Sequence, residues 1–103
     1  MSAFYEITID HLLRATLRVE FTTVAGSICD YSIVLILGTG DGVETIRVYD
    51  AAHGFNEMHR YTRGGGKQAG VRFHPGTLGE GMRDAIAAIE DGYSEMIEGW
   101  RSR

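Results

Sequence analysis

Residues 13–21, LRATLRVEF, alternate strictly between apolar and polar side chains. Arginine, threonine and glutamate fill the even positions, and the odd positions hold Leu13, Ala15, Leu17, Val19 and Phe21. A period of two over this length predicts a β-strand with one buried face and one face in water. This segment therefore predicts a sheet, and the neighbouring segments extend it.

Four further segments fit the same sheet. Tyr5, Ile7 and Ile9 form a shorter alternation upstream, and residues 31–37 are an almost continuous apolar run. Such a run is typical of a central strand covered on both faces. Glycine and aspartate at 38–42 predict a hairpin turn, because they adopt the positive φ angles that it needs. Strands are then expected at 43–49 and 55–62.

The last quarter of the chain changes period. Thr77 and Glu80 form the S/T-x-x-E pattern of a capping box, two residues after Pro75. Apolar residues then recur at steps of three and four as far as Trp100. This spacing predicts one amphipathic helix over 77–101.

Together these elements predict an α+β fold. It is an antiparallel β-meander of four to five strands, with one long C-terminal helix packed on a face. The 103 residues are expected to form a single domain. Residues 1–62 would be mostly meander, 63–76 a glycine-rich basic loop, and 77–101 the helix.

Charge is unevenly distributed along the chain. The net charge of −4 argues against a protein that coats DNA, yet residues 47–74 carry five basic and two acidic side chains. This basic middle segment favours RNA or another phosphate-bearing ligand. Cys29 has no partner for a disulfide, and neither a signal peptide nor a membrane span is recognisable. We therefore expect the cytoplasm and no membrane.

The stretch from Arg47 to Tyr61 holds the candidate chemistry. A corner between strands 43–50 and 55–62 would bring Asp50 and His53 towards one end of the sheet, with the imidazoles open to solvent beside guanidinium groups. Histidine titrates near neutral pH and arginine binds phosphate, so the predicted catalytic residues are His53, His59, Asp50, Arg60 and Glu57. The predicted substrate-binding residues are Arg47, Arg63, Lys67, Tyr49 and Tyr61, and a mobile loop would carry Lys67 over the site.

Two other interpretations of this stretch stay open. Asp50, His53 and His59 could ligate a divalent metal, but their spacing matches no zinc motif, so no metal or cofactor is predicted. Asp50 and His53 could instead only tie down a tight corner of the chain.

Residues 46–54, IRVYDAAHG, resemble a signature of small prokaryotic proteins that reads R-Y-D-x-A-H-G, followed by H-R, here His59-Arg60. Some of these proteins are toxin components of toxin–antitoxin pairs of the TumE type. This chain departs from the pattern at Val48, between the arginine and the tyrosine, and in the longer gap before His59. The resemblance implies a toxin-like module with an antitoxin-like partner protein.

Two functions follow as competing hypotheses. The first is a module that binds or cleaves RNA through its histidines and arginines. The second is a non-catalytic binding or assembly protein, whose His-Gly motif is a structural corner and whose helix mediates self-association. The long apolar stripe of the helix leads us to expect a homodimer.

Overall fold

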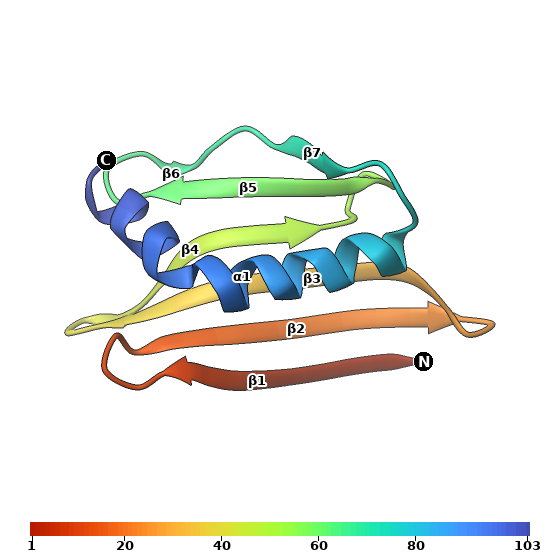
Figure 1. Cartoon of the computed structure of the whole chain (residues 1–103), viewed down its shortest axis with the longest axis horizontal. Coiled ribbons are helices and arrows are strands. Elements are labelled where there is room, and N and C mark those ends of the chain that lie inside the picture. The colour runs from red at the N-terminus through yellow and green to blue at the C-terminus, as the bar shows by residue number, and fades with distance from the viewer.

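The computed structural model describes residues 1–103 as one antiparallel sheet with a single helix (Figure 1). The elements are β1 (Ser2–Asp10), β2 (Ala15–Val24), β3 (Ser27–Thr39), β4 (Gly42–Asp50), β5 (Asn56–Thr62), β6 (Gly66–Lys67), β7 (Val71–His74) and α1 (Leu78–Arg101). The α+β class, the antiparallel sheet and the C-terminal helix are confirmed.

The sheet is larger than the sequence predicted, with seven strands instead of four to five. Its order follows the chain from β1 to β6, and β7 also pairs with β5. Both additional strands lie within 63–76, which the sequence pattern had assigned to a loop. Strands of two and four residues are too short to show a recognisable alternation, so only the structure could reveal them.

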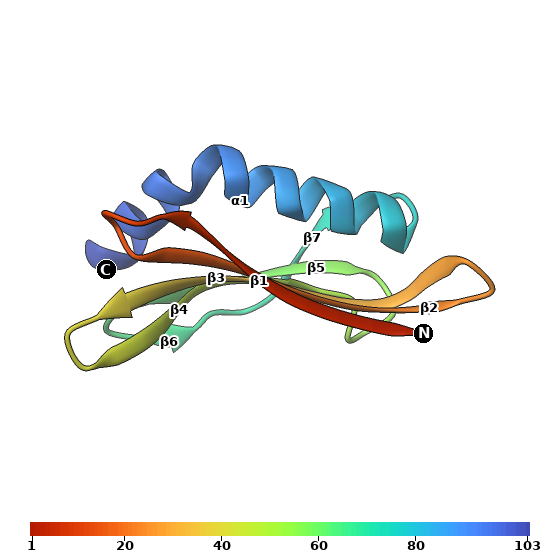
Figure 2. The same cartoon turned by 90° about the horizontal axis from the view of Figure 1, so that it is seen from below.

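The helix covers one face of the sheet and packs mainly on β3, β4 and β5 (Figures 1 and 2). Thr77 caps it in the predicted capping box, with its hydroxyl accepting a hydrogen bond from the Glu80 amide. The apolar stripe of the helix is used inside the molecule, because Ala85, Ile89 and Ile97 are buried in the core. No helix here is long and apolar enough to cross a membrane.

The helix covers one face of the sheet only, so the expectation that residues 31–37 are covered on both faces is wrong for residues 31–35, although Ile36 on the far face is 6% exposed. Ser32 and Val34 alternate with the buried Tyr31, Ile33 and Leu35, as in a strand covered on one side. A β-bulge follows, where Leu35 and Ile36 pair with Arg47 and Thr45 and leave Ile46 as an extra residue. Such a bulge changes which side chains face the core, and Ile46 is buried.

A buried amide fixes the start of β5. Asn56 is 1% exposed, and its Oδ1 accepts a hydrogen bond of 2.6 Å from the Tyr31 hydroxyl. Its Nδ2 donates to the carbonyls of His74, Gly76 and Thr77, on the chain that leads into α1. Asn56 thereby joins β3, β5 and the entry of the helix, and it holds the neighbouring Glu57 in a defined position.

Candidate functional site

The candidate site lies where β4 ends and β5 begins, on the face of the sheet opposite the helix. The connection between the two strands turns away from α1 (Figure 2). Gly54 has a φ of +85°, and its amide donates to the Ala51 carbonyl, which closes the turn. Asp50 is opposite Glu57 in the ladder, and Val48 is opposite His59. Because such pairs project from the same face, the two carboxylates are neighbours.

Glu57 is the centre of the site, because both predicted histidines bind the same carboxylate oxygen. The Nδ1 atom of His53 lies 2.8 Å from Glu57 Oε1, and the Nε2 atom of His59 lies 3.1 Å from it. The hydrogen bond from His53, and secondly the bond and charge of His59, lower the pKa of Glu57. The Glu57 side chain is only 10% exposed, so its carboxylate is an ionised group held largely away from water.

His59 is a buried positioning residue, and the expectation that both imidazoles are open to solvent is wrong for it. Its side chain is 11% exposed, and Nδ1 lies 3.0 Å from the Gln68 carbonyl oxygen. Gly70 passes directly over the ring, where a Cβ would come within 2.7 Å of it. Both ring nitrogens therefore face acceptor oxygens, which fix the orientation of the ring next to the Glu57 carboxylate.

His53 is the exposed member of the pair. Its side chain is 67% exposed, and Nδ1 donates to Glu57, while Nε2 forms no hydrogen bond within the chain. In the neutral ring, a proton fixed on Nδ1 leaves a lone pair on Nε2, directed towards solvent. This arrangement is that of an imidazole ready to accept a proton from a bound molecule.

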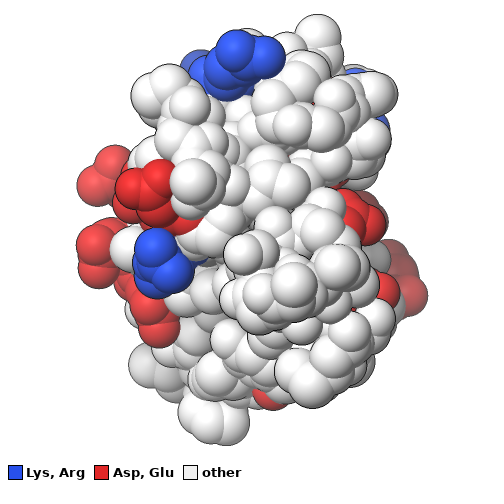
Figure 3. Space-filling view, turned by 90° about the vertical axis from the view of Figure 1, so that its right-hand side faces the viewer, with Lys and Arg blue, Asp and Glu red and all other residues white.

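Phe55 and Arg72, which were not predicted as site residues, lie beside His53. The Phe55 ring stacks on the imidazole with centroids 6.2 Å apart, and Arg72 Cζ lies 4.4 Å from the centre of the Phe55 ring. Arg72 is opposite Glu57 in the β5–β7 ladder. Figure 3 shows this end of the molecule, with basic atoms at its upper margin, the side on which β7 lies. We call His53, Phe55 and Arg72 the His53 platform.

The same side chains could hold a metal ion. Asp50, Glu57 and His59 offer ligand atoms that all lie within 4.8 Å of one another. Two carboxylates and an imidazole suit divalent cations such as Mn²⁺ or Zn²⁺. A hollow of about 260 Å³ adjoins Asp50, with Glu20 and Asp30 in its lining, so this side of the site is acidic.

The remaining predicted residues do not reach this site. Arg47 and Arg60 line a cavity on the helix face, as Tyr61 does, so the guanidinium groups expected beside the imidazoles lie on the other side of the sheet. Tyr49 is 4% exposed and packs edge-on against Phe73 in the core, which leaves no surface for substrate binding.

The glycine-rich segment is also fixed away from the histidines. Lys67 pairs with Tyr61 in the β5–β6 ladder, four residues along β5 from Glu57. At about 3.3 Å per residue, this separation is roughly 13 Å. Arg63 follows the end of β5 and is exposed beyond that point. The expectation that Lys67 covers the site is therefore wrong.

No family model, curated protein or solved structure matches this chain. The likeness of residues 46–54 to TumE-type toxins stays a prediction, and function has to be inferred from the site itself.

Proposed function

We propose that this protein binds single-stranded RNA at the His53 platform and cleaves it, with His53 as the general base. The observation that carries the proposal is the pairing of an exposed imidazole with a largely buried carboxylate, 2.8 Å from His53 Nδ1 to Glu57 Oε1. A carboxylate in this position fixes the tautomer and stabilises the imidazolium that forms when the base takes a proton.

The neighbouring residues supply the other functions that RNA cleavage requires. Arg72 lies over the half-buried Phe55 ring, so a nucleobase can stack on that ring once the guanidinium moves to a phosphate; such stacking contributes about 1–3 kcal/mol per base in single-strand binding. Arg72 is exposed and beside that ring, where its guanidinium can bind the phosphate that follows the base. A base and a phosphate would thus be bound within one nucleotide of the imidazole.

The reaction is an internal displacement at phosphorus. His53 Nε2 removes the proton of the ribose 2′-hydroxyl, and the 2′-oxygen forms a bond to phosphorus. The bond from phosphorus to the 5′-oxygen breaks, and that oxygen takes a proton from solvent. Arg72 stabilises the charge on the non-bridging oxygens, while Glu57, His59 and Asp50 position the base.

A toxin-like activity of this kind would act in the cytoplasm and would require an inhibitor. The resemblance to TumE-type toxins supports an antitoxin-like partner protein. Such a partner would cover the His53 platform, because that surface carries the only exposed imidazole of the site.

Cleavage of a fluorogenic single-stranded RNA tests the proposal. We expect His53→Ala to lower the cleavage rate about 10²–10⁴-fold, the usual contribution of a positioned base. His11→Ala is the matched control, because His11 is an exposed histidine in the β1–β2 turn and should leave the rate unchanged. A wild-type protein that cleaves no RNA, or a His53→Ala variant with full activity, would contradict the proposal.

The acidic hollow beside Asp50 favours a second candidate, hydrolysis that depends on a cation held by Asp50, Glu57 and His59. The two candidates separate in the same assay. General-base cleavage by His53 survives a chelator such as EDTA, whereas a cation-dependent reaction stops and recovers when Mn²⁺ is added back.

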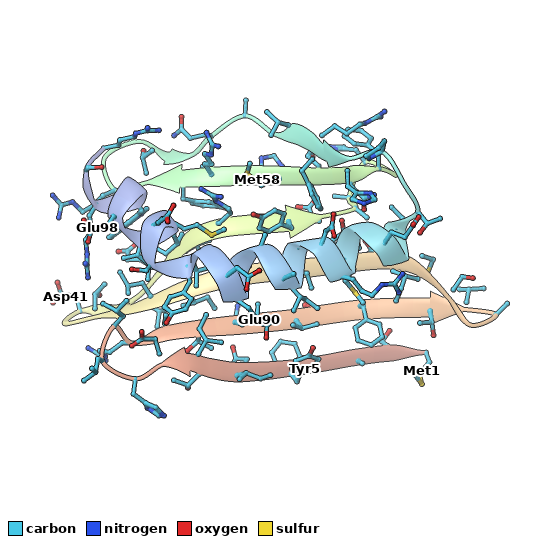
Figure 4. The ribbon with its side chains drawn as sticks, viewed as in Figure 1. Met1, Tyr5, Asp41, Met58, Glu90 and Glu98 are labelled. Carbon is cyan, nitrogen blue, oxygen red and sulfur yellow. The ribbon has the colours of Figure 1, made fainter.

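The alternative function is non-catalytic self-association, and the surface that supports it is β1 and not the helix. This strand pairs with β2 alone, and it exposes Phe4, Tyr5 and Ile7 at an edge of the sheet (Figure 4). An exposed apolar edge strand is a template for pairing with a second copy. If this surface forms the homodimer, Ile7→Lys gives a monomer by light scattering while RNA cleavage is unaffected.

A further inference from the structure

A second cavity lies on the opposite face of the sheet from the His53 platform. It has a volume of about 780 Å³ and opens between β4, β5 and the C-terminal half of α1. Met58, labelled in Figure 4, lies on β5 and is part of the lining. Cavities of roughly 300–1,000 Å³ are the size that small-molecule ligands occupy.

Two arginines meet on one wall of this cavity without any acidic partner. Arg47 is directly opposite Arg60 in the β4–β5 ladder, and both line the cavity. Neither guanidinium forms an ion pair or a hydrogen bond with another residue, and the Nε atom of Arg47 is buried with no partner at all. Like charges opposite one another and unsatisfied buried donors both destabilise a fold.

Regular alternation along β4 places Arg47 on the same face as the buried Tyr49, and the bulge brings Ile46 to that face beside it. Without the extra residue, side chains along β4 would keep strict alternation, and Ile46 and Arg47 would project to opposite faces. Both instead line the same cavity. The backbone of β4 and β5 thus holds two cations next to each other, which lowers the stability of the fold. This is expected where a bound anion neutralises them.

The other walls show what kind of anion fits. Met58, Met96 and Trp100 provide apolar and aromatic surface, and Trp100 is 7% exposed. Glu95 is the one acidic side chain in the lining, and Arg103 is a third arginine there. The cavity thus has a cationic wall that faces apolar and aromatic walls.

We propose that this cavity binds a phosphate monoester with an aromatic body, of the nucleoside monophosphate class. Arg47 and Arg60 bind the phosphate dianion, since guanidinium groups donate in pairs to phosphate oxygens and two positive charges match its two negative ones. The aromatic body packs against Trp100 and Met96, and Glu95 accepts a hydrogen bond from an amino or hydroxyl group of the ligand.

Calorimetric titration with adenosine 5′-monophosphate, inorganic phosphate and adenosine tests this proposal. We expect the monophosphate to bind at least tenfold more tightly than either fragment. Arg47→Met and Arg60→Met should each weaken its binding at least tenfold. Arg83→Met is the matched control, because Arg83 is exposed on α1 outside the cavity, and it should change the affinity less than twofold. Equal affinity for the monophosphate and adenosine, or unchanged affinity in both arginine variants, would overturn the proposal.

A stability measurement separates a ligand site from a structural role of the arginines. In the absence of ligand, Arg47→Met should have a thermal midpoint at least as high as that of the wild type, because it removes a like-charge pair and an unsatisfied donor. A large loss of stability would mean that Arg47 supports the fold, and would overturn the inference.

The same titration distinguishes this cavity from the proposed RNA site. His53→Ala should leave the affinity for the monophosphate within twofold, since the imidazole is on the other face of the sheet. If His53→Ala abolishes binding while Arg60→Met does not, the nucleotide binds at the His53 platform and the cavity proposal is wrong.

Discussion

Substitution of the two histidines bound to Glu57 should change the stability of the protein by very different amounts, because the two side chains differ in burial. His53 has a side chain that is 67% exposed and makes one hydrogen bond. Its removal leaves Glu57 with the His59 donor and lets water replace the exposed imidazole, so the free energy of unfolding should fall by about 0.5 kcal/mol, the lower end of the range for one hydrogen bond. For a domain of this size, 1 kcal/mol shifts the midpoint by roughly 4–8 °C, so His53→Ala should lower it by less than about 4 °C.

His59→Ala removes a ring that is 11% exposed and has a partner at each nitrogen. The Gln68 carbonyl loses its donor, Glu57 loses one of two, and a void opens beneath Gly70. An orphaned buried polar group costs about 1–3 kcal/mol. The midpoint should therefore fall by roughly 4–24 °C.

Thermal unfolding followed by circular dichroism, with urea unfolding for the free energies, measures both effects. Combined with the RNA assay, it separates a catalytic residue from a positioning one: His53→Ala loses activity at nearly constant stability, whereas His59→Ala loses both. If His53→Ala destabilises the protein as much as His59→Ala, the exposed imidazole is part of the structural corner and the reasoning fails.

Three further predictions concern the surroundings of the site. Asn56→Ala should lower the free energy of unfolding by about 3 kcal/mol in urea titrations, because the buried Tyr31 hydroxyl and three carbonyls lose their partner. Thr77→Ala removes the helix cap and should cost about 1 kcal/mol in the same measurement, while a Ser at that position should retain most of it. Hydrogen bonds lower the pKa of Glu57 below its usual 4.5, so its ionisation stabilises the fold above pH 4.5 and this contribution disappears as the pH falls through the lowered pKa. The stability advantage of the wild type over Glu57→Gln should accordingly shrink on acidification below pH 4.5.

The parts of the fold that follow from local pattern were predictable. The alternation of residues 13–21 and the three-and-four spacing after Thr77 correspond to β2 and α1, because each records which side of one element is buried. Alternation along β5 also placed Glu57 and His59 on one face, with Asn56 and Met58 on the other.

The parts that depend on distant segments were not predictable. Gly70, which covers His59, lies eleven residues further along the chain. The sequence around His59 therefore does not indicate that this histidine is buried. Arg72 reaches the site only because the short strand β7 pairs with β5, and the bulge at Ile46 leaves no sign in the hydrophobic pattern. The first two features decided which residues meet at the site, and the bulge placed Ile46 on the helix face.

Cleavage of RNA by His53 requires that the RNA strand binds at the His53 platform. An NMR titration with a short 2′-O-methyl RNA, which lacks the 2′-hydroxyl and is not cleaved, locates it directly. We expect the largest shift changes at His53, Phe55 and Arg72, with Arg63 and Lys67 unaffected. Shift changes confined to the β5–β6 turn, or none at millimolar RNA, would contradict it.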